Sequence, residues 1–123
     1  WELVMEKLPE GAENIATLKV KWDPTYQERV GVKTRAADLT PEQVKTLERL
    51  SKRIYRYLFL SGYARLDYRM TEEGQFYLLE ANPNPQIAHK EDFADSAEYS
   101  GVPYDQLLQK IITVGLNYAG RGA

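Results

Sequence analysis

The segment YARLDYRMTEEGQFYLLEANPNP, Tyr63–Pro85, combines a hairpin pattern with a cluster of polar side chains. Two runs rich in Tyr, Leu and Phe flank the pair Glu73-Gly74. Glycine adopts the positive φ angle that a tight turn needs, so the pattern predicts a β-hairpin with its turn at this pair. The helices predicted before and after the hairpin are expected to pack against one of its faces.

The register of the predicted hairpin brings four polar side chains together. A turn centred on the same pair, with two or four loop residues, places Asp67 opposite Glu80 and Arg65 opposite Asn82. Because side chains alternate along a strand, these four share one face. The other face is predicted to be the core side, and it carries Leu66, Tyr68, Leu79 and Ala81.

The carboxylates of Asp67 and Glu80 would lie at cross-strand distance, about 5 Å between Cβ atoms, and would repel each other without a positive charge between them. Mg²⁺ binds oxygen ligands, usually one or two carboxylates together with waters and substrate phosphates. The two acids and the amide oxygen of Asn82 therefore suit a metal-nucleotide site. The alternative is an ordinary solvated hairpin face on which Arg65 and Arg69 compensate the acids.

The pattern Arg65-x-Asp67, followed by Glu80-x-Asn82-x-x-Pro85, resembles the metal-binding end of the ATP-grasp carboxylate-amine ligases, most closely the D-alanine:D-alanine ligase type. The resemblance implies ATP and Mg²⁺ (or Mn²⁺) as cofactors. It also implies that the Asp, Glu and Asn hold the metal against the ATP phosphates and that Arg65 acts catalytically on the reacting acyl group. Residues 1–123 then form a single lobe, the C-terminal part of an ATP-grasp domain.

Two positions depart from the pattern of that family. The Pro-Gly that usually follows the Asn is Pro85-Gln86 here, and a Ser that contacts the substrate falls near Glu91. These departures leave open a ligase that joins other amino acids or peptides, and a non-catalytic binding or regulatory lobe that retains the fold. Under the ligase interpretation the expected partners are ATP, a carboxylate and amine substrate pair, and an N-terminal ATP-grasp lobe, with a homodimer also allowed. The isolated chain is expected to be inactive.

Composition limits the function classes further. The chain has 123 residues and a formal net charge of −2 at pH 7, a length that fits one domain with its own core. The mixed charges give no basic field for nucleic acid, and the apolar runs are too short to span a membrane. The chain has no Cys, which excludes disulfides and thiolate zinc sites and fits a reducing, cytoplasmic compartment. It begins at Trp1 without an initiator Met, so we expect a fragment or an excised piece.

Two strands are predicted in the N-terminal part of the chain. Residues 1–8 are an apolar run too short for a helix, and a Pro-Glu-Gly turn follows them. Residues 15–22 alternate between apolar and polar side chains, which predicts a second strand ending at Lys21-Trp22. In the resembling ligases a Lys followed by an aromatic residue contacts the ATP phosphates, which implies this role for Lys21. The alternative is a solvated lysine at a strand end.

A connection and a long helix are predicted next. Residues 23–39 contain turn signals and several cations, which predicts either a solvated connection or a basic loop near phosphates. The sequence Thr40-Pro41-Glu42-Gln43 predicts a helix start with a capping box, and the helix is expected to reach about Leu60, with Gly62 in the left-handed position after it. Glu48 and Lys52 are expected to pair on its solvated side. The predicted buried stripe comprises Val44, Leu47, Leu50, Ile54, Tyr57 and Leu58.

A rigid loop and two helices complete the prediction. Two prolines within residues 82–85 remove ladder hydrogen bonds, so the chain leaves the sheet there. His89 follows as a solvated loop residue or, alternatively, a substrate contact. Residues 91–99 predict a short helix stopped by Gly101, and an amphipathic helix follows Pro103. The predicted fold class is α+β, an antiparallel sheet with helices packed on one face.

Overall fold

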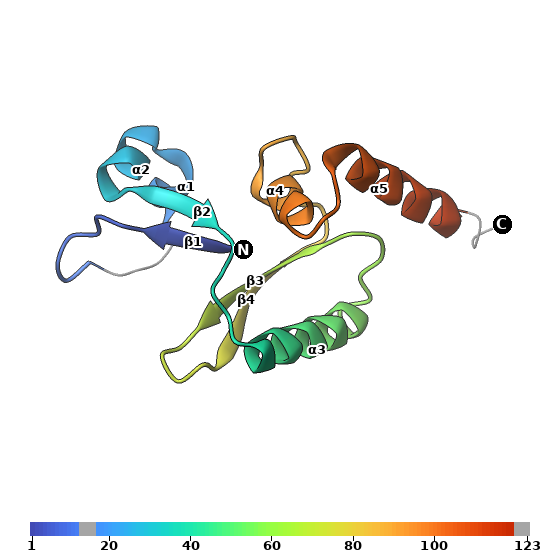
Figure 1. Cartoon of the computed structure of the whole chain (residues 1–123), viewed down its shortest axis with the longest axis horizontal. Helices are drawn as coiled ribbons and strands as arrows, with labels where there is room; N and C mark the ends of the chain where they lie inside the picture. Colours follow the sequence, from blue (N-terminus) through green and yellow to red (C-terminus); the bar gives the residue numbers. More distant parts are fainter. Residues whose placement is uncertain (13–16, 120–123) are drawn as a thin grey trace. The chain divides into compact units, whose positions relative to one another are not determined.

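A computed structural model of the protein describes residues 1–12 and 17–119 (Figure 1). The chain divides into two compact units, Trp1–Ala37 and Asp38–Ala123. Within the described ranges the structure has five helices and four strands, and the strands pair antiparallel in two two-stranded sheets. This confirms the predicted α+β class, with the antiparallel strands divided between two sheets. The prediction of a single lobe over residues 1–123 stays a prediction.

The first unit is built on a pair of short strands. Strand β1 (Glu2–Met5) lies antiparallel to β2 (Val32–Arg35), and ion pairs join Glu2 to Arg35 at 2.7 Å and Glu6 to Lys33 at 2.9 Å. The hydrogen bond from Lys33 lowers the pKa of Glu6 below its ordinary value. All these side chains are largely solvated, so the pairs favour the register while contributing little stability.

The predicted strand over residues 15–22 is wrong where the structure describes it. Residues 13–16 lie outside the described ranges, and Leu18–Trp22 forms helix α1. The Thr17 hydroxyl accepts a hydrogen bond from the Val20 N–H at 3.4 Å and caps the helix start. Five residues of alternating polarity also fit one and a half helical turns, so the capping residue decides between strand and helix.

The segment predicted as a connection also contains regular structure. Helix α2 (Pro24–Val30) occupies most of it, and β2 follows. The Asp23 carboxylate accepts from the Tyr26 N–H at 3.0 Å, and Gly31 ends the helix at φ 63°. The Asp-Pro and Val-Gly pairs that were interpreted as turns are therefore the start and stop of a helix. Among the described side chains of this unit, Val20 and Val30 are the buried apolar ones, 3% and 0% exposed.

The second unit begins with helix α3 (Pro41–Tyr57). The predicted capping box is confirmed, because the Thr40 N–H donates to Gln43 Oε1 at 2.8 Å and the Gln43 N–H donates to Thr40 Oγ1 at 3.3 Å. The predicted buried stripe is only partly correct, since no residue of α3 is buried. Leu47, Leu50 and Ile54 are half-buried. The exposed members of the stripe are Val44, Tyr57 and Leu58.

Helix α3 ends three residues before the predicted position, and Phe59 occupies the left-handed position directly after its C-cap. Gly62 also has a positive φ of 75°, as predicted, but it lies in the loop beyond this cap. The Phe59 N–H donates to the Arg56 carbonyl and the Leu60 N–H donates to the Tyr55 carbonyl, which is the hydrogen-bond pattern of a Schellman cap. Phe59 has φ 52° and is 93% exposed. It therefore adopts a backbone conformation that favours glycine without gaining compensating burial.

Replacing Phe59 with Gly is accordingly expected to increase the free energy of unfolding by about 1 kcal/mol, because the left-handed conformation costs a side-chain-bearing residue that much. Urea denaturation of the two proteins measures the change. Phe59→Ala is the control, since it removes the ring but keeps the Cβ atom and hence the strain. Equal stabilisation by both substitutions would show that the exposed ring, not the backbone, is unfavourable.

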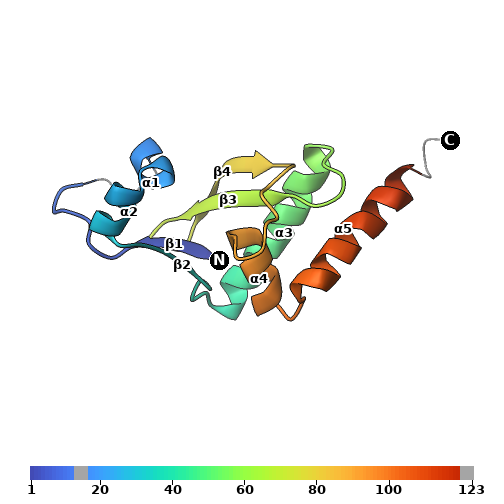
Figure 2. The same ribbon diagram turned by 90° about the horizontal axis from the view of Figure 1, so that it is seen from above.

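A hairpin and two helices complete the second unit. Strands β3 (Arg65–Met70) and β4 (Phe76–Asn82) form the hairpin, and α3 lies along one side of it (Figures 1 and 2). Ser51 Oγ of α3 is hydrogen-bonded to the Tyr68 hydroxyl of β3 at 2.9 Å, which anchors the helix to the core side of the hairpin. None of the described helices is both long and apolar enough to span a membrane.

The predicted C-terminal helices are confirmed as α4 (Asp92–Tyr99) and α5 (Tyr104–Ala119). Ala94 of α4 and Leu107 of α5 are buried, 2% and 8% exposed. Pro85, in the loop between β4 and α4, is also buried. Helices α4 and α5 contact each other, and the ring of Tyr63, just before β3, lies 5.7 Å from the ring of Phe93 on α4.

Candidate functional site

The predicted pairing of the polar residues is confirmed. Asp67 lies opposite Glu80, and Arg65 lies opposite Asn82, in the antiparallel ladder of β3 and β4. The hairpin therefore places two carboxylates, an amide and a guanidinium at neighbouring positions. Because Tyr68 contacts α3 through its hydroxyl, alternation places Asp67 on the face directed away from that helix.

The route to this pairing differs from the predicted one, because the ladder contains a bulge. Near the turn the partners are Met70 with Phe76 and Tyr68 with Leu78, and the loop comprises the five residues 71–75. Continued without a bulge, this register would place Asp67 opposite Leu79. Leu79 is left out of the pairing instead, and this single extra residue brings Glu80 opposite Asp67.

The bulge also corrects the predicted core side of the hairpin. Leu79 was assigned to it, yet its side chain is 68% exposed, while Leu66, Tyr68 and Ala81 are half-buried. Leu78, which pairs with Tyr68, is 38% exposed. A bulge advances the side-chain alternation by one position, so Leu78 and not Leu79 lies opposite Tyr68, and it is less exposed than Leu79.

Arg65 and Asp67 form the strongest ion pair of the site. The Arg65 Nε donates to Asp67 Oδ1 at 2.8 Å, and a terminal guanidinium nitrogen donates to Oδ2 at 3.0 Å. The two side chains are 39% and 37% exposed, so solvent screens the pair only in part. These hydrogen bonds raise the pKa of Arg65 above its ordinary value, against a smaller opposing contribution from partial burial. Both oxygens of Asp67 are thus engaged by one guanidinium.

Asn82 is oriented by the loop that follows it. Its Oδ1 accepts a hydrogen bond from the Asn84 N–H at 2.9 Å, and Asn84 Oδ1 accepts from the Tyr63 hydroxyl at 3.3 Å. The ring of Tyr63 lies 5.7 Å from that of Phe93 on α4. An amide oxygen has two lone pairs, so Asn82 Oδ1 can accept this hydrogen bond and still coordinate a cation.

The donor set fits a hard cation that also binds other oxygens. Across residues 1–12 and 17–119, no three or more His, Cys, Asp and Glu side chains are grouped to hold a metal ion. The hairpin offers two carboxylates, Asp67 and Glu80, and one amide oxygen. Mg²⁺ prefers six oxygen ligands and commonly takes several from water or phosphate. The residues present therefore suit a metal that arrives with a phosphate ligand.

Two further predicted positions lie outside the hairpin. Lys21 belongs to helix α1 of the first unit, not to the end of a strand, and its contact with phosphates stays a prediction. His89 is exposed, and its ring lies 4.9 Å from the ring of Tyr104 at the start of α5. The exposure of His89 supports the interpretation as a solvated loop residue.

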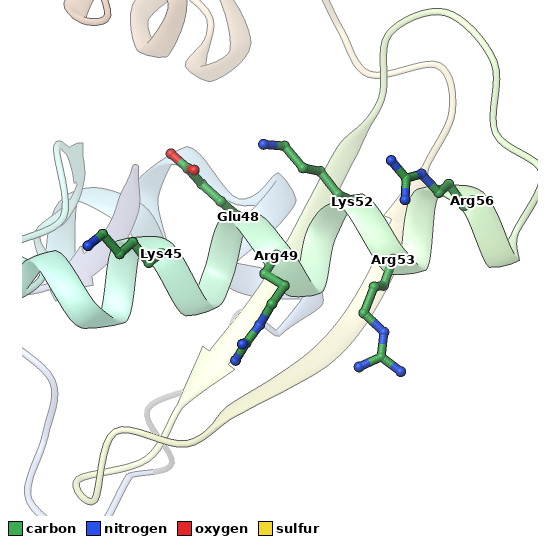
Figure 3. Close-up of a pocket in the computed structure, with 6 residues that line it drawn as sticks. All are labelled: Lys45, Glu48, Arg49, Lys52, Arg53 and Arg56. Atoms are coloured by element: carbon green, nitrogen blue, oxygen red, sulfur yellow. The ribbon is translucent and has the colours of Figure 1, made fainter.

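A basic strip on α3 was missed by sequence reasoning. Five cations and one acid line a shallow hollow on the exposed side of the helix, as Figure 3 shows: Lys45, Glu48, Arg49, Lys52, Arg53 and Arg56. The predicted Glu48–Lys52 ion pair is absent from the described part of the chain. Spacings of three and four residues between the cations would have revealed the strip. All six side chains are exposed, so bulk water screens any anion bound there.

Comparison with known proteins gives a consistent result. A family described as "D-ala D-ala ligase C-terminus" matches residues 13–113. The D-alanine–D-alanine ligase of Geobacillus kaustophilus is 35% identical over 80 residues, which cover 65% of this chain and 22% of the relative. The corresponding ligase of Haemophilus influenzae is 36% identical over 80 residues, 65% of this chain and 27% of the relative.

The chain covers only a part of each of these relatives and of a third one. The bifunctional enzyme MurC/Ddl of Chlamydia trachomatis is 31% identical over 98 residues, which cover 74% of this chain and 12% of that protein. The chain thus spans between about an eighth and about a quarter of the length of these relatives. The match includes the whole hairpin, so the polar cluster lies within the shared region.

Proposed function

We propose a function from the premise that this chain belongs to the D-alanine–D-alanine ligase C-terminal family, whose pattern covers residues 13–113. The chain acts as the ATP- and Mg²⁺-binding C-terminal lobe of a larger ATP-dependent carboxylate-amine ligase. The observation that carries the proposal is the cross-strand pairing of Asp67 with Glu80 and of Arg65 with Asn82. Two acids held at neighbouring positions repel each other unless a positive charge compensates them. Arg65 compensates Asp67 in this structure, and a bound cation would compensate both acids.

Asp67, Glu80 and Asn82 are the proposed metal-binding residues. Bound Mg²⁺ would supply neutralisation of phosphate charge during an in-line phosphoryl transfer. The hairpin holds the two carboxylates on adjacent strands, so their spacing is defined by the sheet rather than by flexible loops. The hydrogen bond from the Asn84 N–H keeps the amide of Asn82 in one orientation. Few side-chain rotations are then lost when the metal binds.

Arg65 and Lys21 are the proposed residues for the charged parts of the substrates. The expected reaction activates a carboxylate as an acyl phosphate, which an amine then attacks with loss of phosphate. The Arg65 guanidinium would donate hydrogen bonds to the oxyanion that develops at the acyl carbon, a role worth roughly 3 kcal/mol per donor. Lys21 would contact the nucleotide phosphates.

Two positions of the chain favour a second candidate for the substrates. Gln86 follows Pro85 where the family has glycine, and Glu91 stands near the position of a substrate-binding serine. A side chain and a negative charge at these two positions would reshape a pocket for a small amino acid. A ligase for other amino acids or short peptides is therefore the second candidate.

Exposed apolar side chains support the proposal that further parts of a ligase pack against this chain. In the described part of the second unit, several large side chains on α5 and at the end of α3 are more than 60% exposed. They are Tyr57, Phe59, Ile112, Leu116 and Tyr118. Apolar area of this kind is typical of a surface that is covered in a larger protein.

A titration with Mn²⁺ and ATP tests the proposed site. With backbone amides assigned by NMR, the paramagnetic ion is expected to broaden signals around Asp67, Glu80 and Asn82, and Asp67→Asn should abolish this local broadening. Glu72→Gln is the matched control, because it removes one exposed carboxylate from the turn of the same hairpin. Broadening centred on Lys45–Arg56 would instead place the nucleotide on the basic strip and overturn the proposed site.

A further inference from the structure

The Arg65–Asp67 ion pair poses a problem for the proposed metal site. The guanidinium donates to both oxygens of Asp67, at 2.8 and 3.0 Å. A parallel pair of charge-assisted hydrogen bonds is the strongest arrangement available to an arginine and a carboxylate. A cation that coordinates Asp67 must therefore compete with Arg65 for the same oxygens.

We infer that Arg65 and the metal exchange at Asp67, so that metal binding releases the guanidinium for its catalytic role. This inference rests on the proposed function and deepens it. Without metal, Arg65 compensates the charge of Asp67 and keeps the two carboxylates of the hairpin from repelling each other. With metal, the cation takes over that compensation, and the guanidinium becomes available to an anionic acyl group.

The surroundings of Arg65 explain why it would stay in the site after release. Glu80 and Asp92 also attract its charge, and Asp92 is the first residue of α4. Once the metal occupies Asp67 and Glu80, Asp92 remains as an electrostatic partner. The Arg65 side chain would then move from Asp67 toward Asp92 and would stay close to the site.

The partial exposure of the pair makes the exchange feasible. At 39% and 37% exposure, the ion pair lies between a solvated pair, which contributes little, and a buried one. Removing the guanidinium should therefore tighten metal binding by a factor of roughly three to ten. Tighter binding excludes an ordinary supporting role for Arg65, because loss of a supporting residue weakens a metal site.

Three variants separate the exchange from a general charge effect. Arg65→Gln removes both the charge and the paired hydrogen bonds. Arg65→Lys keeps the charge but cannot form the two parallel bonds, and should tighten metal binding by about twofold to threefold. Arg69→Gln removes one positive charge from the same strand, also two residues from Asp67, and so measures the effect of a nearby charge on the affinity.

The experiment measures Mn²⁺ affinity of the 123-residue chain without nucleotide, by electron paramagnetic resonance of the free ion. Amide spectra confirm that each variant is folded. In the unsubstituted chain, Mg²⁺ should also shift the Arg65 Nε–H signal as the hydrogen bond to Asp67 breaks. Tighter binding in Arg65→Gln, an intermediate effect in Arg65→Lys and a shifted Nε–H signal would support the exchange.

Three results would overturn the exchange while leaving the metal site intact. They are unchanged or weaker binding in Arg65→Gln, equal tightening by Arg65→Gln and Arg69→Gln with none by Arg65→Lys, and an unmoved Arg65 signal in the metal-bound chain. Absence of Mn²⁺ binding at Asp67 and Glu80 in the unsubstituted chain would overturn the proposed function itself, and the exchange with it.

Discussion

Asp67→Asn and Glu80→Gln in the full-length protein are each expected to lower kcat/KM for ligation about a thousandfold, equivalent to roughly 4 kcal/mol of transition-state stabilisation. Each substitution removes one of the two carboxylates that the hairpin pairs across its strands. The neutral amide keeps the size of the side chain, so the strands and their bulge should persist. Loss of charge at either position would leave the proposed metal site with one carboxylate, so the metal and its bound nucleotide would be held less firmly.

The measurement is steady-state ligation at saturating ATP, with phosphate release followed continuously. Amide spectra and urea denaturation establish that the fold is kept. Glu72→Gln provides the matched control, because it makes the same chemical change at an exposed turn position and should leave activity unchanged. Turnover near that of the unsubstituted enzyme in Asp67→Asn or Glu80→Gln would contradict the metal assignment.

Arg65→Lys is expected to lower kcat about 100-fold while changing KM for ATP by less than about threefold. Lysine retains the positive charge but cannot present two parallel N–H groups, so stabilisation of the developing oxyanion falls. The ATP-binding residues are untouched in this variant. The loss should therefore appear in the chemical step, which single-turnover kinetics isolates from substrate binding and product release.

The kinetic result for Arg65→Lys and its Mn²⁺ affinity are expected to change in opposite directions. The same variant should bind Mn²⁺ more tightly and react more slowly, since the proposal has Arg65 compete with the metal for Asp67 in one state and bind the substrate in the other. A residue needed only for structure would weaken both properties. A normal kcat in Arg65→Lys would remove Arg65 from the proposed catalytic role.

The proposed site residues of the two units differ in how directly a substitution tests their roles. Asp67, Glu80 and Asn82 all belong to the hairpin of the second unit, so their geometry is internal to one compact part. Lys21 belongs to the first unit and to a helix that the alternating pattern did not predict. A substitution of Lys21 therefore tests the resemblance to the ligases rather than the hairpin geometry.

Sequence by itself determined the features that depend on local chemistry. Thr40 and Gln43 form a capping box wherever a helix follows, because their side chains reach the free backbone N–H groups of the first turn. The position of Asp67 opposite Glu80 was predicted from a turn centred on Glu73-Gly74, and the structure reaches the same pairing through a bulge. The family pattern was also visible, since it consists of residue types at fixed spacing in one hairpin.

Only the tertiary structure decided the features that depend on distant neighbours. The loop comprises residues 71–75 and is centred on Glu73, whereas the predicted turn is centred between Glu73 and Gly74. The bulge at Leu79 compensates for this difference and brings Glu80 opposite Asp67. The side of the hairpin that faces α3 is fixed by the Tyr68–Ser51 hydrogen bond. Exposure of Val44 and Tyr57 depends on what packs against α3, which helical periodicity does not specify. The two parallel hydrogen bonds between Arg65 and Asp67 likewise depend on the side-chain rotamers. These rotamers depend on the surrounding charges, which the spacing of the residues does not specify.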